Sequence, residues 1–182
     1  GSAVSACALA GNAPALSKDF NPATIVVGGL STLTITLSNP TPAAATLTAP
    51  LIDTLPMGVT VAANPGVSTS CGGSGAPVAL AGATTVTLPA GRTIPANGSC
   101  TLTVTVASAV AGTYFNTLLA GSLVTSAGAN AAAAIATLTV IASQPPPPVP
   151  FIPVPAIGGF GLLLLGSALM LTGLALARRQ SA

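Results

Sequence analysis

Aliphatic and threonine residues alternate along the centre of the chain. Residues 32–37 read TLTITL and residues 101–106 read TLTVTV, and residues 85–88 and 136–140 are shorter copies of the same pattern. Successive side chains of a β-strand point to opposite faces, so each segment would bury an aliphatic row and expose a threonine row. Threonine is β-branched and polar, which suits the wet face of a sheet. The alternation therefore predicts strands.

Turn residues separate these segments, among them Gly28-Gly29, Asn39-Pro40 and Asn97-Gly98. Short strands punctuated in this way indicate an antiparallel sandwich rather than a parallel sheet. We therefore expect an all-β domain, a Greek-key β-sandwich of about seven strands. Further strands are predicted near residues 23–27, 46–51, 58–62 and 112–119. The domain would span residues 17–143, after an N-terminal extension over residues 1–16.

The C-terminal part of the chain changes character. Residues 144–155 read QPPPPVPFIPVP, and proline favours a polyproline II spacer there. Residues 156–177 are 22 residues without a charge, about 33 Å as a helix and long enough to span a membrane. Arg178 and Arg179 open a basic tail, residues 178–182, that the positive-inside tendency places in the cytoplasm, with the sandwich outside. A buried core helix is the alternative, but the segment has no polar face.

Charged residues make up 3% of the chain, against about a quarter in an ordinary soluble domain. Apart from the two terminal arginines they are Lys18, Asp19, Asp53 and Arg92. Nucleic-acid binding needs a dense set of Lys and Arg to displace counterions from phosphates, so this partner is excluded. Disordered chains combine high net charge with low hydrophobicity, whereas 51% of these residues are hydrophobic. A folded, nearly uncharged domain follows.

The chain has three cysteines. Cys100 shares parity with Leu102 and Val104, and Cys71 shares parity with Val67, so both cysteines should face the core. We expect them to form a disulfide in an exported protein. Residues 1–16 have the small, polar character of a mature N-terminus, in which Cys7 would be free, would pair between chains, or would carry a lipid.

Candidate catalytic residues are few, because the chain has no His and no Glu. Asp53 precedes a Pro turn, where an aspartate is normally a local hydrogen-bond acceptor. A Ser–Lys dyad would need Lys18 to be buried, and Ser17 would point to the opposite face of a strand. Calcium bound through Asp19 or Asp53 is an alternative, but zinc lacks a ligand set. We therefore expect no enzyme activity, no cofactor, no metal site and no small-molecule substrate.

One resemblance covers about two thirds of the chain, from about Phe20 to Ile141. It rests on residues 20–25 (FNPATI), 31–35 (STLTI), 53–59 (DTLPMGV) and 97–100 (NGSC). These segments resemble the immunoglobulin-like repeat domains of unknown function found in large bacterial surface proteins. The resemblance implies an immunoglobulin-like sandwich with an extracellular role, and it transfers no catalytic residue.

A second resemblance concerns the tail. Ile152-Pro153 and the two residues after it, followed by the apolar segment and then Arg178-Arg179, are similar to the C-terminal sorting signals (IPTL or PEP-CTERM type) that exosortases recognise in Gram-negative bacteria. The layout of short motif, single span and basic end matches, whereas Val154-Pro155 stands where the signal usually has Thr-Leu. The resemblance implies an extracytoplasmic bacterial protein, in the periplasm or on the cell surface.

These observations favour a structural or assembly protein of the cell envelope, tethered to a membrane and acting through protein–protein contacts. Gly159, Gly166 and Gly173 recur every seven residues and would let another helix approach closely, although lipid-facing glycines are equally compatible. We therefore expect a homo-oligomer or a larger membrane complex. An accessory single-span subunit is one alternative function. A carbohydrate-binding or adhesion module is another, but with no Trp the chain offers little for a sugar to stack on.

Overall fold

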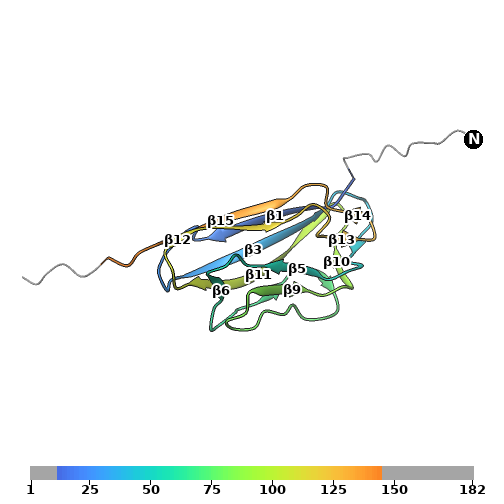
Figure 1. Cartoon of the computed structure of the whole chain (residues 1–182). Helices are drawn as coiled ribbons and strands as arrows, with labels where there is room; N and C mark the ends of the chain where they lie inside the picture. The colour runs from blue at the N-terminus through green and yellow to red at the C-terminus, as the bar shows by residue number, and fades with distance from the viewer. Residues whose placement is uncertain (1–11, 145–182) are drawn as a thin grey trace, which may run out of the picture. The chain divides into compact units, whose positions relative to one another are not determined.

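The alternating segments form the central strands of an all-β domain in the computed structural model, which describes residues 12–144 (Figure 1). Fifteen strands are present in this part of the chain. The longer ones are β1 (Ala15–Asn21), β3 (Leu30–Asn39), β5 (Leu51–Thr54), β9 (Thr85–Leu88), β11 (Gly98–Ser108), β12 (Gly112–Leu118) and β15 (Ala134–Ile141). The shorter ones are β2 (Thr24–Val26), β4 (Ala45–Thr46), β6 (Val59–Val61), β7 (Ser68–Thr69), β8 (Gly72–Gly73), β10 (Arg92–Ile94), β13 (Val124–Thr125) and β14 (Gly128–Ala129).

One layer of the domain is a sheet with the strand order β1-β3-β11-β6, in which β7 also pairs with β11. β3 and β11 run antiparallel over ten residue pairs, with Leu37 opposite Cys100 and Leu33 opposite Val104. Because paired residues point to the same face, these apolar side chains are buried together, while the threonines between them stay at the surface. The threonine alternation thus produces the layer that it predicts.

The other layer contains the sheet β12-β15-β2 and the pair β5-β9, with β5 beside β12. Leu138 and Val140 of β15 and Leu51 and Leu88 of the β5-β9 pair point into the shared core, where they are almost fully buried. Figure 1 places β10, β13 and β14 together at one end of the domain. The core is therefore aliphatic and lies between two layers of a β-sandwich.

The fold differs from the prediction in four respects. The predicted number of about seven strands is too low, because many strands are only two to four residues long. β2 and β15 pair in parallel rather than antiparallel. The strand predicted over residues 46–51 is divided between β4 and β5, with Pro50 just before β5. β1 was not predicted and begins at Ala15, just before the expected start of the domain.

Within residues 12–144 the structure has no helix, and so none that could cross a membrane. The expected spacer from residue 145 onward, the apolar segment 156–177 and the basic tail 178–182 lie outside the described residues.

Candidate functional site

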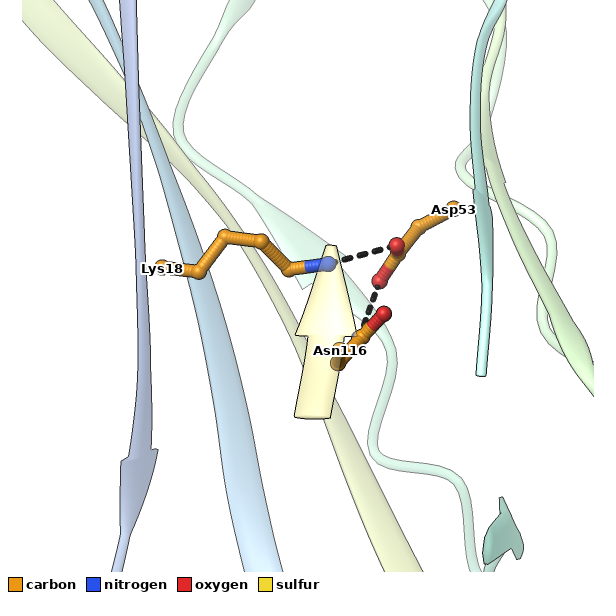
Figure 2. Close-up of polar contacts among 3 residues, drawn as sticks. All are labelled: Lys18, Asp53 and Asn116. Atoms are coloured by element: carbon orange, nitrogen blue, oxygen red, sulfur yellow. Dashed lines mark hydrogen bonds and ion pairs between the residues drawn. The ribbon is translucent and has the colours of Figure 1, made fainter. Parts of the chain in front are cut away.

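Three polar side chains meet inside the sandwich, each from a different strand (Figure 2). Lys18 Nζ on β1 lies 2.5 Å from Asp53 Oδ1 on β5. The other carboxylate oxygen, Asp53 Oδ2, accepts a hydrogen bond of 2.8 Å from Asn116 Nδ2 on β12. One carboxylate therefore holds an amine with one oxygen and a carboxamide with the other. We call these three residues the core triad.

Strand parity places the core triad in the interior. On β1, Lys18 shares the inward face with Phe20, which is 2% exposed. On β5, Asp53 shares it with Leu51, and on β12 Asn116 shares it with Leu118. The side chains of Lys18 and Asp53 have no exposed area, and Asn116 is fully buried. Because the apolar residues on the same face of each strand are buried in the core, the three polar side chains are buried with them, away from bulk water.

Burial dominates the electrostatics of the core triad. Removal from water lowers the pKa of Lys18 below its ordinary value of 10.5, because desolvation disfavours the charged ammonium. The charge of Asp53 and its hydrogen bond act in the opposite direction and offset part of this effect. Asn116 Oδ1 is buried as well and has no hydrogen-bond partner among the described residues. An unpaired buried acceptor costs free energy and calls for an explanation.

The chemistry of the core triad is that of proton exchange between an amine and a carboxylate. Asp53 binds the nitrogen atoms of both neighbours, so it can take a proton from Lys18 beside the amide group of Asn116. Among residues 12–144, no three His, Cys, Asp or Glu residues gather into a group that could hold a metal ion.

Sequence reasoning missed the core triad. The interpretation of Asp53 as a local turn acceptor before Pro56 is wrong, because its carboxylate binds side chains 35 and 63 residues away. Ser17 is exposed and points away from Lys18, as expected, so no Ser–Lys pair forms. The signal that could have revealed the triad is parity: Lys18, Asp53 and Asn116 each occupy a position where the alternation requires an apolar residue.

The predicted disulfide is confirmed: Cys71 and Cys100 are bonded, with their Cα atoms 4.8 Å apart. Both cysteines are buried in the core. Arg92 Nη1 donates a hydrogen bond of 2.9 Å to the carbonyl oxygen of Cys71, the residue just before β8. Disulfides persist in oxidising compartments, so this bond points to an extracytoplasmic location.

The remaining predicted site residues lie outside the part of the chain that the structure describes. They are Cys7, Ile152, Pro153, Gly159, Gly166, Gly173, Arg178 and Arg179. The structure therefore does not test the predicted free or intermolecular thiol, the helix-packing glycines or the sorting and stop-transfer residues.

The two outer faces of the sandwich differ in chemistry. On the layer of β3 and β11 the outward residues are mostly threonines and serines, with Leu30 exposed at the start of β3 and Ala107 near the end of β11. Pairs such as Ser68–Thr103 and Ser70–Thr101 share hydrogen bonds. The other layer exposes large apolar side chains from four strands. We call these five residues the aliphatic face: Phe115 at 64% exposure, Ile135 at 59%, Ile52 at 52%, Ile141 at 49% and Val26 at 48%.

Comparison with solved structures finds low similarity. A crystal structure of BslA, described as a bacterial hydrophobin, shares 19% sequence identity and a TM-score of 0.47, over 73% of this chain and 97% of that one. A non-cellulosomal cohesin from the archaeon Archaeoglobus fulgidus shares 9% identity and a TM-score of 0.37, over 70% and 91% of the two chains. No curated protein matches the sequence.

A protein-family model described as a domain of unknown function, DUF7933, matches residues 14–140. This range begins one residue before β1 and ends within β15, so it contains the sandwich, the core triad and the disulfide. The chain belongs to the DUF7933 family.

Proposed function

We propose that this protein is a non-enzymatic structural or assembly protein of a bacterial cell surface, and that it acts through contacts with other copies of itself. The observation that carries the proposal is the aliphatic face. Contiguous apolar surface surrounded by polar residues is typical of protein interaction sites. On this protein the five members of the aliphatic face lie on one outer face of the sandwich, with threonines between them.

The composition of the aliphatic face supports a contact between like surfaces. The outward positions of β2, β5, β12 and β15 carry its five members together with threonines, and no charged residue is among them. Phe115 and Ile135 stand on paired strands, opposite Thr137 and Thr117 respectively. Two copies of such a face can meet without desolvating a charge and without like-charge repulsion, which is what an isologous contact requires.

The scarcity of surface charge acts in the same direction. Four charged residues lie within residues 12–144, and two of them, Lys18 and Asp53, form the buried ion pair and contribute no charge to the surface. Asp19 is exposed and Arg92 is half-buried, so they are the charges left near the surface of this part of the chain. Soluble domains usually stay apart through mixed surface charges, and net charge near zero favours association.

We also propose that residues 156–177 anchor the domain in a membrane, with Arg178 and Arg179 on the cytoplasmic side and the sandwich outside. The support is the uncharged length of the segment and the arginines that follow it. Processing of the tail by an exosortase is part of this proposal. Carbonate extraction tests the anchor: full-length protein that washes off the membrane contradicts it.

Native mass of the full chain in mild detergent tests the contact. We expect a discrete oligomer for the wild type and a monomer for Phe115→Lys, because a charge within the aliphatic face would have to be desolvated on contact. Thr32→Lys, on the opposite outer face, is the matched control and should leave the oligomer intact. A monomeric wild type, or equal effects of the two lysines, would contradict the proposal.

A further inference from the structure

The core triad contains every group needed to form an amide bond between two side chains. Lys18 supplies a nitrogen nucleophile and Asn116 supplies a carboxamide carbon. Because Lys18 Nζ and Asn116 Nδ2 bind the two oxygens of one carboxylate, at 2.5 and 2.8 Å, the amine and the carboxamide lie next to each other (Figure 2). We propose that Lys18 Nζ attacks Asn116 Cγ and that the two side chains become joined by an isopeptide bond, with Asp53 as the proton carrier.

The reaction balances without any added reagent. Asp53 first takes a proton from the Lys18 ammonium, which leaves a neutral amine and a neutral carboxylic acid. The amine lone pair forms the Nζ–Cγ bond, and the carbonyl oxygen of Asn116 carries the developing negative charge. A second Nζ proton passes to the amide nitrogen, the Cγ–Nδ2 bond breaks, and ammonia leaves. The products are one isopeptide N–H group, one ammonia molecule and a protonated Asp53, so the net charge of the site is zero before and after.

Burial favours each step. Desolvation lowers the pKa of Lys18, so less free energy is needed to form the neutral, nucleophilic amine. The strands hold the amine and the carboxamide against the two oxygens of one carboxylate, so the step avoids the entropic cost of bringing two free reactants together. Exclusion of water keeps hydrolysis from competing with attack by the amine.

The reaction also explains the unpaired Asn116 Oδ1, which is the oxygen that carries the developing negative charge. It is buried without a hydrogen-bond partner while Nδ2 faces the carboxylate. Once Asp53 is protonated it becomes a donor, and a half-turn of the amide group presents Oδ1 to it. That hydrogen bond would stabilise the negative charge that develops on the oxygen, as a donor in an oxyanion hole does. The same bond would satisfy the carbonyl oxygen of the product.

The position of the bond gives it a mechanical consequence. It would join β1, the first strand, to β12, in the other layer of the sandwich, across 98 residues of sequence (116 minus 18). A covalent link at this point resists separation of the two layers. This inference does not depend on the proposed self-association, because it concerns the interior of one domain.

The trypsin sites make the test direct. The chain has four Lys and Arg residues, so a chain without the bond yields the fragments 1–18, 19–92 and 93–178 after denaturation and reduction. With the bond, Lys18 resists cleavage and fragment 1–92 stays joined to fragment 93–178. The intact mass of the reduced full-length protein should also be lower by one ammonia, and fragmentation of the joined peptide should locate the link at Lys18 and Asn116.

Two variants serve as controls. Lys18→Arg keeps a cation beside Asp53 but removes the amine, and Asp53→Asn removes the proton carrier; both should show the full mass and separate fragments. Circular dichroism checks that each variant folds. The wild-type protein is sufficient to test the bond. An intact mass without the loss of ammonia, together with a free fragment 1–18, would overturn the proposal. A joined peptide in Asp53→Asn would overturn the role of Asp53.

Discussion

Lys18 Nζ and Asp53 Oδ1 are 2.5 Å apart in the core, although the two residues are 35 positions apart in sequence and belong to different layers of the sandwich. This contact fixes the position of β1 relative to β5. Breaking a buried pair is far more costly than replacing both partners, because one charge is then left without compensation. One pair of variants makes this difference measurable.

The first prediction concerns the cost of an uncompensated charge. Asp53→Leu leaves the Lys18 ammonium buried alone, whereas Lys18→Met combined with Asp53→Leu removes both charges. We expect the double variant to be more stable than Asp53→Leu by about 3–5 kcal/mol, measured by urea unfolding. Neither variant can form an isopeptide bond, so the comparison isolates the charge. Equal stabilities would show that Lys18 reaches water.

The second prediction concerns pH and uses the same variants. In Asp53→Leu, burial still lowers the pKa of Lys18, and the opposing effect of Asp53 is gone. Between that lowered pKa and the unfolded value of 10.5, the unfolded chain binds more protons than the folded one. The free energy of unfolding of Asp53→Leu should therefore rise with pH in this window, relative to the double variant. A flat difference from neutral pH to 10.5 would contradict the lowered pKa.

The same residues show how far the sequence alone reaches. Alternation of threonine with aliphatic residues predicted β3, β9, β11 and β15, and the parity of Cys71 and Cys100 predicted their bond. Alternation failed at β1 because Lys18 stands where the pattern needs an apolar residue. A lysine at an inward position is recognisable only when its acidic partner is known, and that partner comes from a strand far along the chain.

Other features lie beyond local patterns for related reasons. A period of two does not distinguish parallel from antiparallel neighbours, so the pairing of β2 with β15 was not predictable. Asp53 was interpreted from its neighbour Pro56, whereas its partners are set by tertiary structure. The aliphatic face requires knowing that β2, β5, β12 and β15 occupy one layer, and the sequence does not reveal which strands are neighbours.

The third prediction concerns the disulfide, which closes a loop with a sequence separation of 29. A loop of this size restricts the unfolded chain by roughly 3–4 kcal/mol in the chain-entropy model. Cys71→Ala combined with Cys100→Ala should lose a stability of that order in urea unfolding, and Cys7→Ser should lose none. Alkylation of both core thiols in native, unreduced protein would show that the bond is absent from the exported molecule.

The fourth prediction concerns Gly58, which has a φ of +98° and lies against Tyr114. A Cβ at Gly58 would come within 2.8 Å of Tyr114 Cε1, while Tyr114 is held by a hydrogen bond from its hydroxyl to the carbonyl oxygen of Val110. Gly82 also has a positive φ, of +76°, but an added Cβ would meet nothing within 4 Å. Gly82→Ala should thus cost only backbone strain, about 1–2 kcal/mol.

Gly58→Ala should cost clearly more than Gly82→Ala, because the ring must move as well. Thermal unfolding of the two variants measures the difference. Equal losses of stability would mean that the Tyr114 ring moves aside at no free-energy cost and that its packing contributes little to the stability of the domain.

Photo-cross-linking in the native bacterium tests whether copies of the protein meet through the aliphatic face. A photoreactive amino acid is placed at position 115 in one strain and at position 32, on the opposite outer face, in another. We expect position 115 to capture a second copy of this chain on the cell surface and position 32 to capture none. Absence of a captured copy at position 115, or equal capture at both positions, would contradict it.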